Sequence, residues 1–245
     1  MTPLPILVIN RAPDSVRLAR FAHSAAKLGL EFSRIDAVDG HGPAAALGAY
    51  AEYLPDRFNG GERIKPGAFA CALSHARAWE QLIESGARAA LICEDDVELL
   101  AAPPRPPAYC DVLFCGGRMV VWRGAPGPAE PVSVALARMS ARDAAPGDPG
   151  LSAAPGAEAY VVTATAARRL LALLARDKVR AGIDWLMLGW ATPRAARPNW
   201  PELIDLPEGP LRALVSGSAT ARCAPAASAI KHSVTIPIAA LRARA

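Results

Sequence analysis

The chain has 245 residues, 52% of them hydrophobic and 20% charged, with a formal net charge of +4. This composition supports one large hydrophobic core, in a single domain or in a domain with a small appendage. The mild positive charge fits an anionic substrate or an acidic membrane surface, but it is too small and too dispersed for a protein that binds nucleic acid.

The N-terminal residues 1–10 carry no basic leader, and their apolar run is too short for a signal peptide. No segment reaches the roughly 20 apolar residues that a transmembrane helix needs. The five cysteines form no Cys-x-x-Cys pair, and most lie in apolar surroundings, so we expect small buried thiols in a reducing compartment. These features predict a soluble cytoplasmic protein.

The first elements alternate as strand, helix and strand. Residues 6–9 form a short apolar run typical of a buried strand, and a helix begins at Asp14 or Ser15 and ends at Gly29. Residues 31–35 predict a second strand. An order of strand, helix and strand favours a parallel sheet.

The next segment is interpreted as surface chain followed by a helix and a strand. Residues 41–66 hold Gly, Pro and mixed charge, which is typical of a long surface segment. Apolar residues then recur at helical spacing from Phe69 to Ile83, and Gly86 ends this helix. Residues 89–93 predict the strand that follows.

The middle of the chain changes character after Glu98. Four prolines between residues 103 and 107 exclude a helix. Residues 111–115 and 119–122 are interpreted as two strands, and residues 124–157 as a loop that forms a lid or an insert on the acceptor side.

The last third begins with a strand at residues 159–163, and Thr163 or Thr165 caps the helix after it. Pro and Arg dominate beyond Trp190, up to a helical end at residues 238–245. We therefore predict one domain over residues 1–190, with residues 191–245 as an extension packed on it.

Three consecutive acids, Glu94, Asp95 and Asp96, directly follow the predicted strand 89–93. Open α/β folds bind ligands at this edge of the sheet. The three carboxylates repel one another, so we expect a cation among them, and oxygen ligands suit Mg²⁺ or Mn²⁺. In an extended chain Glu94 and Asp96 point the same way, with Asp95 opposite, so we predict that Glu94 and Asp96 form the metal site. Asp96 is the predicted direct ligand, and Glu94 acts on the metal through a water molecule or contacts the ribose. A solvated turn is the alternative.

A Ser-His pair lies inside the apolar helix that begins near residue 67. Ser74 and His75 are adjacent, so they do not share a face, and one can point to the core and the other to a cleft. A purely structural histidine is the alternative. No G-x-S-x-G motif accompanies the pair, which argues against a Ser-His-Asp hydrolase.

The run from Gly67 to Val97 resembles the signature of glycosyltransferase family 25, the group of bacterial lipooligosaccharide galactosyltransferases and collagen galactosyltransferase domains. Its most specific part is the Cys-x-x-Ser-His block followed at this distance by Glu-Asp-Asp. Residues 8–17, 34–40, 156–162 and 183–184 resemble further blocks of the family, in the family's order. Residues after 188 match poorly, which leaves the choice of acceptor open.

The resemblance implies an α/β fold of the GT-A kind, with a mostly parallel Rossmann-type sheet flanked by helices and a variable C-terminal part. It also implies that Mn²⁺ or Mg²⁺ assists the inverting transfer of galactose or glucose from a UDP-sugar to a bacterial surface glycan of the lipooligosaccharide or LPS type. We expect a glycan or glycolipid acceptor, no nucleic acid, no obligate protein partner, and peripheral contact with the inner face of the cytoplasmic membrane.

Two other classes of protein are alternatives to a transferase. A catalytically silent domain that binds a nucleotide sugar or a glycan is the main alternative. A nucleotidyltransferase would need a glycine-rich phosphate loop near the first strand, and residues 10–14 contain no glycine.

An inverting transfer needs a general base that deprotonates the acceptor hydroxyl. The resemblance points to Asp184, with Glu158 as the second candidate, although Asp184 could equally cap a helix. The resemblance also implies a C-terminal residue, commonly His, that completes the metal shell, and His232 is the only candidate in the tail. An exposed histidine with no such role is the alternative.

The remaining candidates are predicted to contact the donor. Asn10, Arg17, Asp36 and Asp39 lie at the exits of the first two strands, near the expected nucleoside, where ordinary turn capping would also explain the two aspartates. The donor-binding set predicted from the sequence is completed by Ser74, His75 and Asp95.

Overall fold

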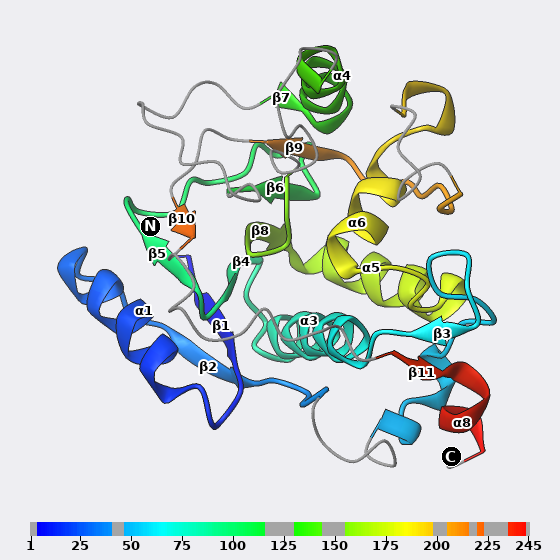
Figure 1. Cartoon of the computed structure of the whole chain (residues 1–245). Helices are drawn as coiled ribbons and strands as arrows, with labels where there is room; N and C mark the ends of the chain where they lie inside the picture. Colours follow the sequence, from blue (N-terminus) through cyan, green and yellow to red (C-terminus); the bar gives the residue numbers. More distant parts are fainter. Residues whose placement is uncertain are drawn as a thin grey trace.

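The computed structural model describes residues 4–40, 47–115, 130–143, 155–197, 205–215, 220–222 and 235–243. Its centre is a seven-stranded sheet with the strand order β2-β1-β4-β8-β6-β9-β7 (Figure 1). The strands are β1 (Ile6–Asn10), β2 (Ser33–Asp36), β4 (Ala89–Glu94), β6 (Val112–Phe114), β7 (Glu130–Pro131), β8 (Ala159–Thr163) and β9 (Ala213–Val215).

The sheet is mixed. β1 is parallel to both β2 and β4, and β6 is parallel to β9. β8 is antiparallel to both of its neighbours, β4 and β6, and β7 is antiparallel to β9. The predicted α/β class is therefore confirmed, whereas the predicted parallel arrangement holds for β2, β1 and β4 and fails where β8 enters the sheet.

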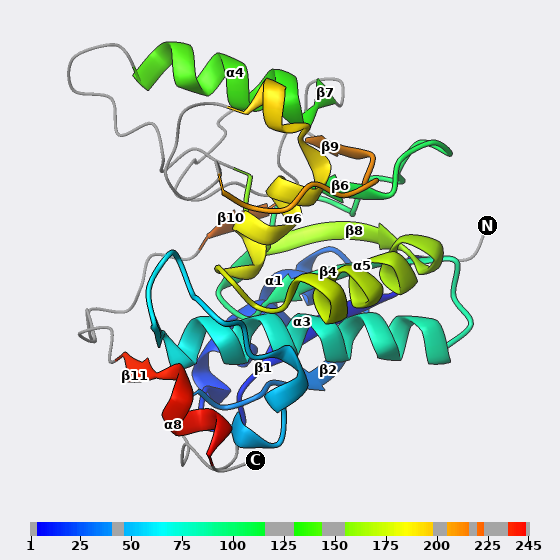
Figure 2. The ribbon, with the colours of Figure 1, turned by 90° about the vertical axis from the view of Figure 1, so that its right-hand side faces the viewer.

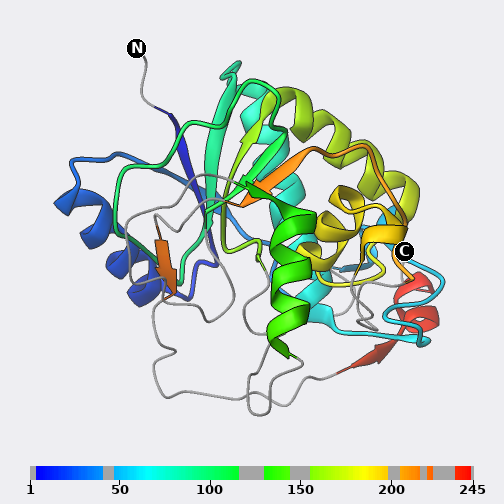
Figure 3. The same cartoon turned by 90° about the horizontal axis from the view of Figure 1, so that it is seen from above.

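Helices cover both faces of the sheet. α1 (Ser15–Lys27) lies on one face, and α3 (Pro66–Glu84), α5 (Ala164–Asp177) and α6 (Ile183–Ala191) lie on the other (Figures 1 and 2). Seen from above, α1 in blue and α5 in yellow-green lie on opposite sides of the strands (Figure 3). No helix in the described part of the chain is both long and apolar enough to cross a membrane.

Alternate residues of the central strands supply two separate hydrophobic cores. Ile92 and Tyr160 face the core under α3, α5 and α6, whereas Leu91 and Val161 face the core under α1. This alternation follows from the two-residue period of a strand, and it explains why the predicted strands are apolar throughout.

Residues 41–66 were predicted to be surface chain, and the structure corrects this for residues 47–66. They include η1 (Ala51–Tyr53) and β3 (Arg63–Ile64), and Leu47, Leu54, Phe58 and Ile64 are buried in the larger core. The four apolar residues are too far apart in sequence to form a helix or strand pattern, which is why the sequence did not reveal their burial.

The predicted loop at residues 124–157 contains a helix, α4 (Val132–Asp143), after β7. Its buried residues Val132, Ala135 and Leu136 recur at helical spacing, but the surrounding Pro and Gly residues obscured this pattern. The strand predicted at residues 119–122 lies outside the described residues.

The C-terminal part adds strands to elements from the first half of the chain. β9 lies between β6 and β7 in the main sheet, and β10 (Thr220–Arg222) pairs with β5 (Val97–Leu99). β11 (Ile236–Pro237) pairs with β3 and leads into α8 (Ile238–Arg242), whose Ile238 and Leu241 are buried in the larger core. The short helix η3 (Arg194–Ala196) follows α6.

Candidate functional site

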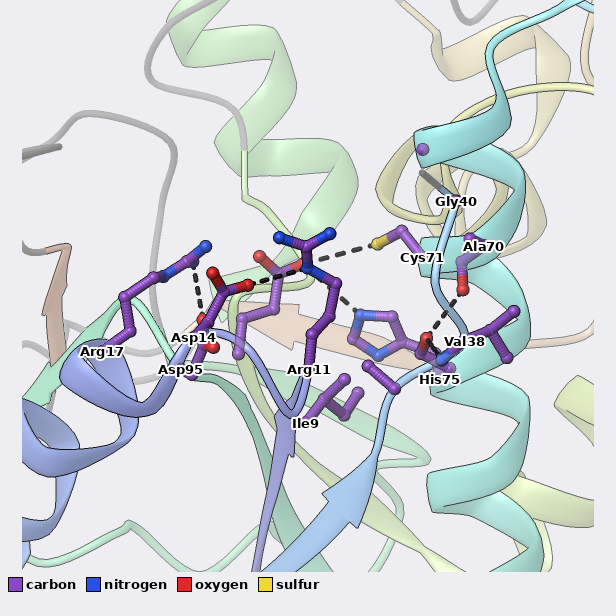
Figure 4. A pocket seen from close by; sticks show the side chains of 14 residues that line it. Ile9, Arg11, Asp14, Arg17, Val38, Gly40, Ala70, Cys71, His75 and Asp95 are labelled. Carbon is purple, nitrogen blue, oxygen red and sulfur yellow. Dashed lines mark hydrogen bonds and ion pairs between the residues drawn. The ribbon is translucent and has the colours of Figure 1, made fainter. Parts of the chain in front are cut away.

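A pocket of about 170 Å³ lies where β1, β2 and β4 end, and we call it the strand-end pocket (Figure 4). These three strands are parallel, so their carboxyl ends meet at one edge of the sheet, the place where open α/β folds bind ligands. The first turns of α1 and α3 complete it. Its lining residues are Ile9, Arg11, Asp14, Arg17, Ala37, Val38, Gly40, Gly67, Ala70, Cys71, Ser74, His75, Glu94 and Asp95.

A second pocket of about 230 Å³ lies beside the start of α6, and we call it the α6 pocket. It is lined by Ala68, Cys71, Glu94, Ala157, Glu158, Gly182, Ile183 and Asp184. Cys71 and Glu94 line both pockets, so the two cavities share a wall. The structure therefore brings Glu94 together with Asp184 and Glu158, the two acids nominated as general base.

The three acids 94–96 face two different partners. Because β4 ends at Glu94, residues 95 and 96 form a turn, and the predicted extended geometry does not apply. Asp95 and Asp96 both pair with Arg17, at 2.6 Å and 3.2 Å from its Nη2. Glu94 instead lies 3.5 Å from Nε2 of His75. The cation expected among the acids is, in this arrangement, the guanidinium of Arg17.

Asp95 is buried, and each of its carboxylate oxygens has a partner. Its Oδ1 contacts Arg17, and its Oδ2 accepts a hydrogen bond of 2.7 Å from Nδ2 of Asn10. Burial raises the pKa of Asp95, and the hydrogen bond from Asn10 and the charge of Arg17 oppose this rise. Asp95 therefore joins the end of β1 to the end of β4, and Arg17 reaches the pair from α1.

Three other residues predicted to contact the sugar-nucleotide donor, Asn10, Asp36 and Asp39, differ in how deeply they are buried. Asn10 is buried beneath the pocket, and its Oδ1 accepts a hydrogen bond of 2.8 Å from Nε of Arg34. Asp36 is 76% exposed and pairs with the same Arg34, at 2.6 Å from its Nη2. Asp39 pairs with Arg11, whose side chain lines the pocket. Neither Asp36 nor Asp39 lines the pocket itself.

Ser74 fixes the chain after β2 against α3. Its Oγ accepts a hydrogen bond of 2.9 Å from the backbone N–H of Val38 and donates one of 2.7 Å to the carbonyl of Ala70. Gly40 allows the same close approach, because a Cβ there would lie 2.7 Å from the carbonyl oxygen of Pro66. Ser74 thus shapes the pocket wall through a structural hydrogen bond.

His75 is fully buried and held by a hydrogen-bonded chain. Its Nδ1 lies 2.9 Å from the hydroxyl of Tyr160, which accepts a 2.8 Å hydrogen bond from Nε1 of Trp79. Burial raises the pKa of Tyr160 well above its usual value, so the hydroxyl keeps its proton and can donate it to Nδ1. Nε2 of His75 then faces Glu94 without a hydrogen bond of its own.

Cys71, His75 and Glu94 form a compact cluster in the wall between the two pockets. Their Sγ, Nε2 and carboxylate oxygen lie within 4.8 Å of one another, and Sγ of Cys71 donates a 3.6 Å hydrogen bond to Oε1 of Glu94. The sequence analysis did not predict this group. A signal was present, because positions 71 and 75 are four residues apart and so share one face of α3.

The two candidates for the general base, Asp184 and Glu158, are both buried. Asp184 lies in the first turn of α6, and its Oδ1 accepts a 2.9 Å hydrogen bond from the backbone N–H of Trp185. The side chain of Glu158 lies over Gly156, where a Cβ would come within 1.9 Å of Oε2, so a residue with a side chain would displace this carboxylate. His232 lies outside the described residues.

Residues 4–102 match the family model described as glycosyltransferase family 25 (LPS biosynthesis protein). The match confirms the resemblance found in the sequence over this part of the chain, and it indicates a glycosyltransferase. It includes every residue that lines the strand-end pocket, whereas Glu158 and Asp184 lie beyond it. None of the curated proteins compared with the chain matches it significantly.

Proposed function

We propose that the protein transfers a hexose, galactose or glucose, from a UDP-sugar to a bacterial surface glycan, with inversion at the anomeric carbon and on a fold of the GT-A kind. The observation that carries this proposal is the shared wall of the two pockets at Cys71 and Glu94. A transfer reaction must hold donor and acceptor with the reacting atoms adjacent, and two cavities with a common wall provide this arrangement.

The strand-end pocket is assigned to the nucleotide diphosphate of the donor. Two guanidinium groups, Arg11 and Arg17, line it together with three carboxylates, Asp14, Glu94 and Asp95. A diphosphate would add further negative charge to a lining that already has more acids than arginines. Additional positive charge therefore favours donor binding, and a divalent cation is the usual source in phosphoryl chemistry.

Mn²⁺ or Mg²⁺ was predicted between Glu94 and Asp96. The side chains do not fit this pair of ligands as they stand, because Glu94 faces His75 while Asp96 pairs with Arg17. Arg17 is 43% exposed, so its side chain has room to move away from the two aspartates. Chelation experiments test whether Mn²⁺ or Mg²⁺ takes part, and the residue roles assigned below do not depend on either ion.

The α6 pocket is assigned to the acceptor, with Asp184 as the general base. An acid in the first turn of a helix is stabilised in its ionised form by the helix dipole and by backbone N–H groups, and a base must be ionised. Asp184 would take the proton of the acceptor hydroxyl while that oxygen attacks the anomeric carbon. The bond from this carbon to the diphosphate breaks, and UDP leaves with the bonding electron pair.

The decisive experiment measures UDP release from UDP-galactose and UDP-glucose by wild type, Asp184→Asn and Glu158→Gln. We expect Asp184→Asn to lower kcat by roughly 10²-fold to 10⁴-fold, the usual contribution of a general base, with little change in donor affinity. Asp56→Asn, at an exposed carboxylate, is the matched control. A wild-type protein that binds a UDP-sugar but releases no UDP, with or without acceptor, would instead be the silent binding domain.

A further inference from the structure

We propose that Cys71, His75 and Glu94 form a binding site for a soft divalent cation of the Zn²⁺ class. A thiolate, an imidazole and a carboxylate are a donor set that zinc uses in proteins, whereas Mg²⁺ and Mn²⁺ prefer oxygen ligands alone. Three protein ligands leave the fourth tetrahedral position open, which is typical of zinc sites that meet a substrate or water.

The distances between the three side chains match a tetrahedral site. With metal bonds of about 2.3 Å to sulfur and about 2.0 Å to nitrogen and oxygen, ligand atoms lie about 3.3–3.6 Å apart. Oε1 of Glu94 lies 3.6 Å from Sγ of Cys71 and 3.5 Å from Nε2 of His75. The three ligand atoms all lie within 4.8 Å of one another, so an approach of Sγ to Nε2 by at most about 1.5 Å would complete the geometry.

The orientation of His75 is fixed from behind, as it is for metal-binding histidines in general. The hydroxyl of Tyr160 contacts Nδ1 and is itself held by Trp79, and all three side chains are buried. The Tyr160 oxygen has two lone pairs, so it can accept from Nδ1–H of the metal-bound tautomer as well as from Trp79, with its own proton turned away from the ring. On metal binding, the imidazole proton moves from Nε2 to Nδ1, and the thiol of Cys71 releases its proton to solvent.

The position of the site suggests its use, and this part of the inference rests on the proposed function. Cys71 and Glu94 line both pockets, so a cation bound there would lie between the donor and the acceptor. Because Cys71 gives up a proton when the metal binds, the site would add one net positive charge to a donor pocket whose carboxylates outnumber its arginines. A cation at this site would therefore balance charge without moving Arg17 from Asp95 and Asp96.

The test is a titration of the full chain with Co²⁺, after removal of bound metals by a chelator. Co²⁺ replaces Zn²⁺ in such sites, and a thiolate ligand gives a charge-transfer band in the near ultraviolet. We expect about one equivalent of Co²⁺ to bind to wild type and the charge-transfer band to be lost in Cys71→Ser. Cys71→Ser and His75→Gln should each lower the affinity for Co²⁺ more than ~100-fold, which exceeds the usual effect of changing a residue behind a metal ligand. Cys110→Ser is the matched control, since a hydroxyl can keep the hydrogen bond to the carbonyl of Val112.

A second measurement does not depend on the folding of a variant. Wild type is alkylated with iodoacetamide with and without saturating Zn²⁺, and the modified cysteines are identified by peptide mass spectrometry. We expect Zn²⁺ to slow the alkylation of Cys71 at least tenfold. A thiolate band that persists in Cys71→Ser, a wild type without such a band, or alkylation of Cys71 at the same rate with Zn²⁺ would overturn the site. Neither assay contains a sugar nucleotide, so failure here is distinct from failure of the transferase proposal.

Discussion

Replacing Tyr160 with Phe tests the buried chain that orients His75. The substitution keeps the ring and its packing but removes the hydroxyl, which is the hydrogen-bond partner of both Trp79 and His75. Both groups are fully buried, and a buried polar group left without a partner costs about 1–3 kcal/mol. We therefore expect a loss of about 3 kcal/mol in the free energy of unfolding, which corresponds to about 6 °C in Tm for a chain of this length.

The assay is urea unfolding followed by fluorescence and circular dichroism, with Tyr109→Phe as the control because Tyr109 is 60% exposed. If the hydroxyl also orients His75 toward the metal, Tyr160→Phe should weaken Co²⁺ binding about 10-fold to 100-fold, as changes behind a metal ligand do. A loss of stability below about 1 kcal/mol, within the range of one net hydrogen bond, would refute the interpretation that Tyr160 satisfies both partners.

Three further predictions follow from single contacts. Asp96→Ala removes one of the two carboxylates paired with Arg17, so the fold should stay intact and Arg17 should be freer to bind a diphosphate. A large loss of transfer in Asp96→Ala, together with inhibition by EDTA that Mn²⁺ but not Zn²⁺ reverses, would instead favour the acid turn over the cluster of Cys71, His75 and Glu94 as the metal site. Thr163→Ala should cost about 1 kcal/mol of stability in urea unfolding, because Oγ1 of Thr163 accepts the N–H of Ala166 at the start of α5. Burial raises the pKa of Cys110 from 9.0 to about 11, so iodoacetamide at pH 8 should leave this thiol unmodified while it alkylates Cys71. The contribution of the protonated thiol to the free energy of unfolding should be full below pH 9 and lost as the pH rises through 11. Cys110→Ala should remove this pH dependence.

The elements with a regular apolar pattern could be predicted from the sequence. β1, β4 and β8 are uninterrupted apolar runs, and α3 repeats its buried residues at helical spacing, so their type and approximate ends were confirmed. Thr163 was predicted as a helix cap and forms that contact. The antiparallel entry of β8 was not predictable, because strand direction is set by packing and chain connection rather than by the strand's own residues.

The orientations of Glu94, Asp95 and Asp96 could not be predicted from the sequence, for a different reason. Side-chain alternation applies only while the chain stays extended, and here the strand ends at Glu94. The partner that draws Asp95 and Asp96 together is Arg17, which lies nearly eighty residues away in the sequence. Local patterns indicated that a cation belongs near the acids, but they could not identify an arginine on α1 as that cation.

The cluster of Cys71, His75 and Glu94 was predictable only in part, because its remaining contacts join residues far apart in the sequence. Helical spacing alone places Cys71 and His75 on one face of α3. The contact with Glu94 depends on how α3 packs on β4, and the support of His75 depends on Tyr160, 85 residues further along the chain. The cluster lies within the residues that match the glycosyltransferase family, while Glu158 and Asp184 of the α6 pocket lie beyond them. Substitutions in the cluster should therefore impair UDP release with every acceptor, whereas substitutions at Ala157 or Ile183, which line only the α6 pocket and have no proposed chemical role, should change which acceptor is used.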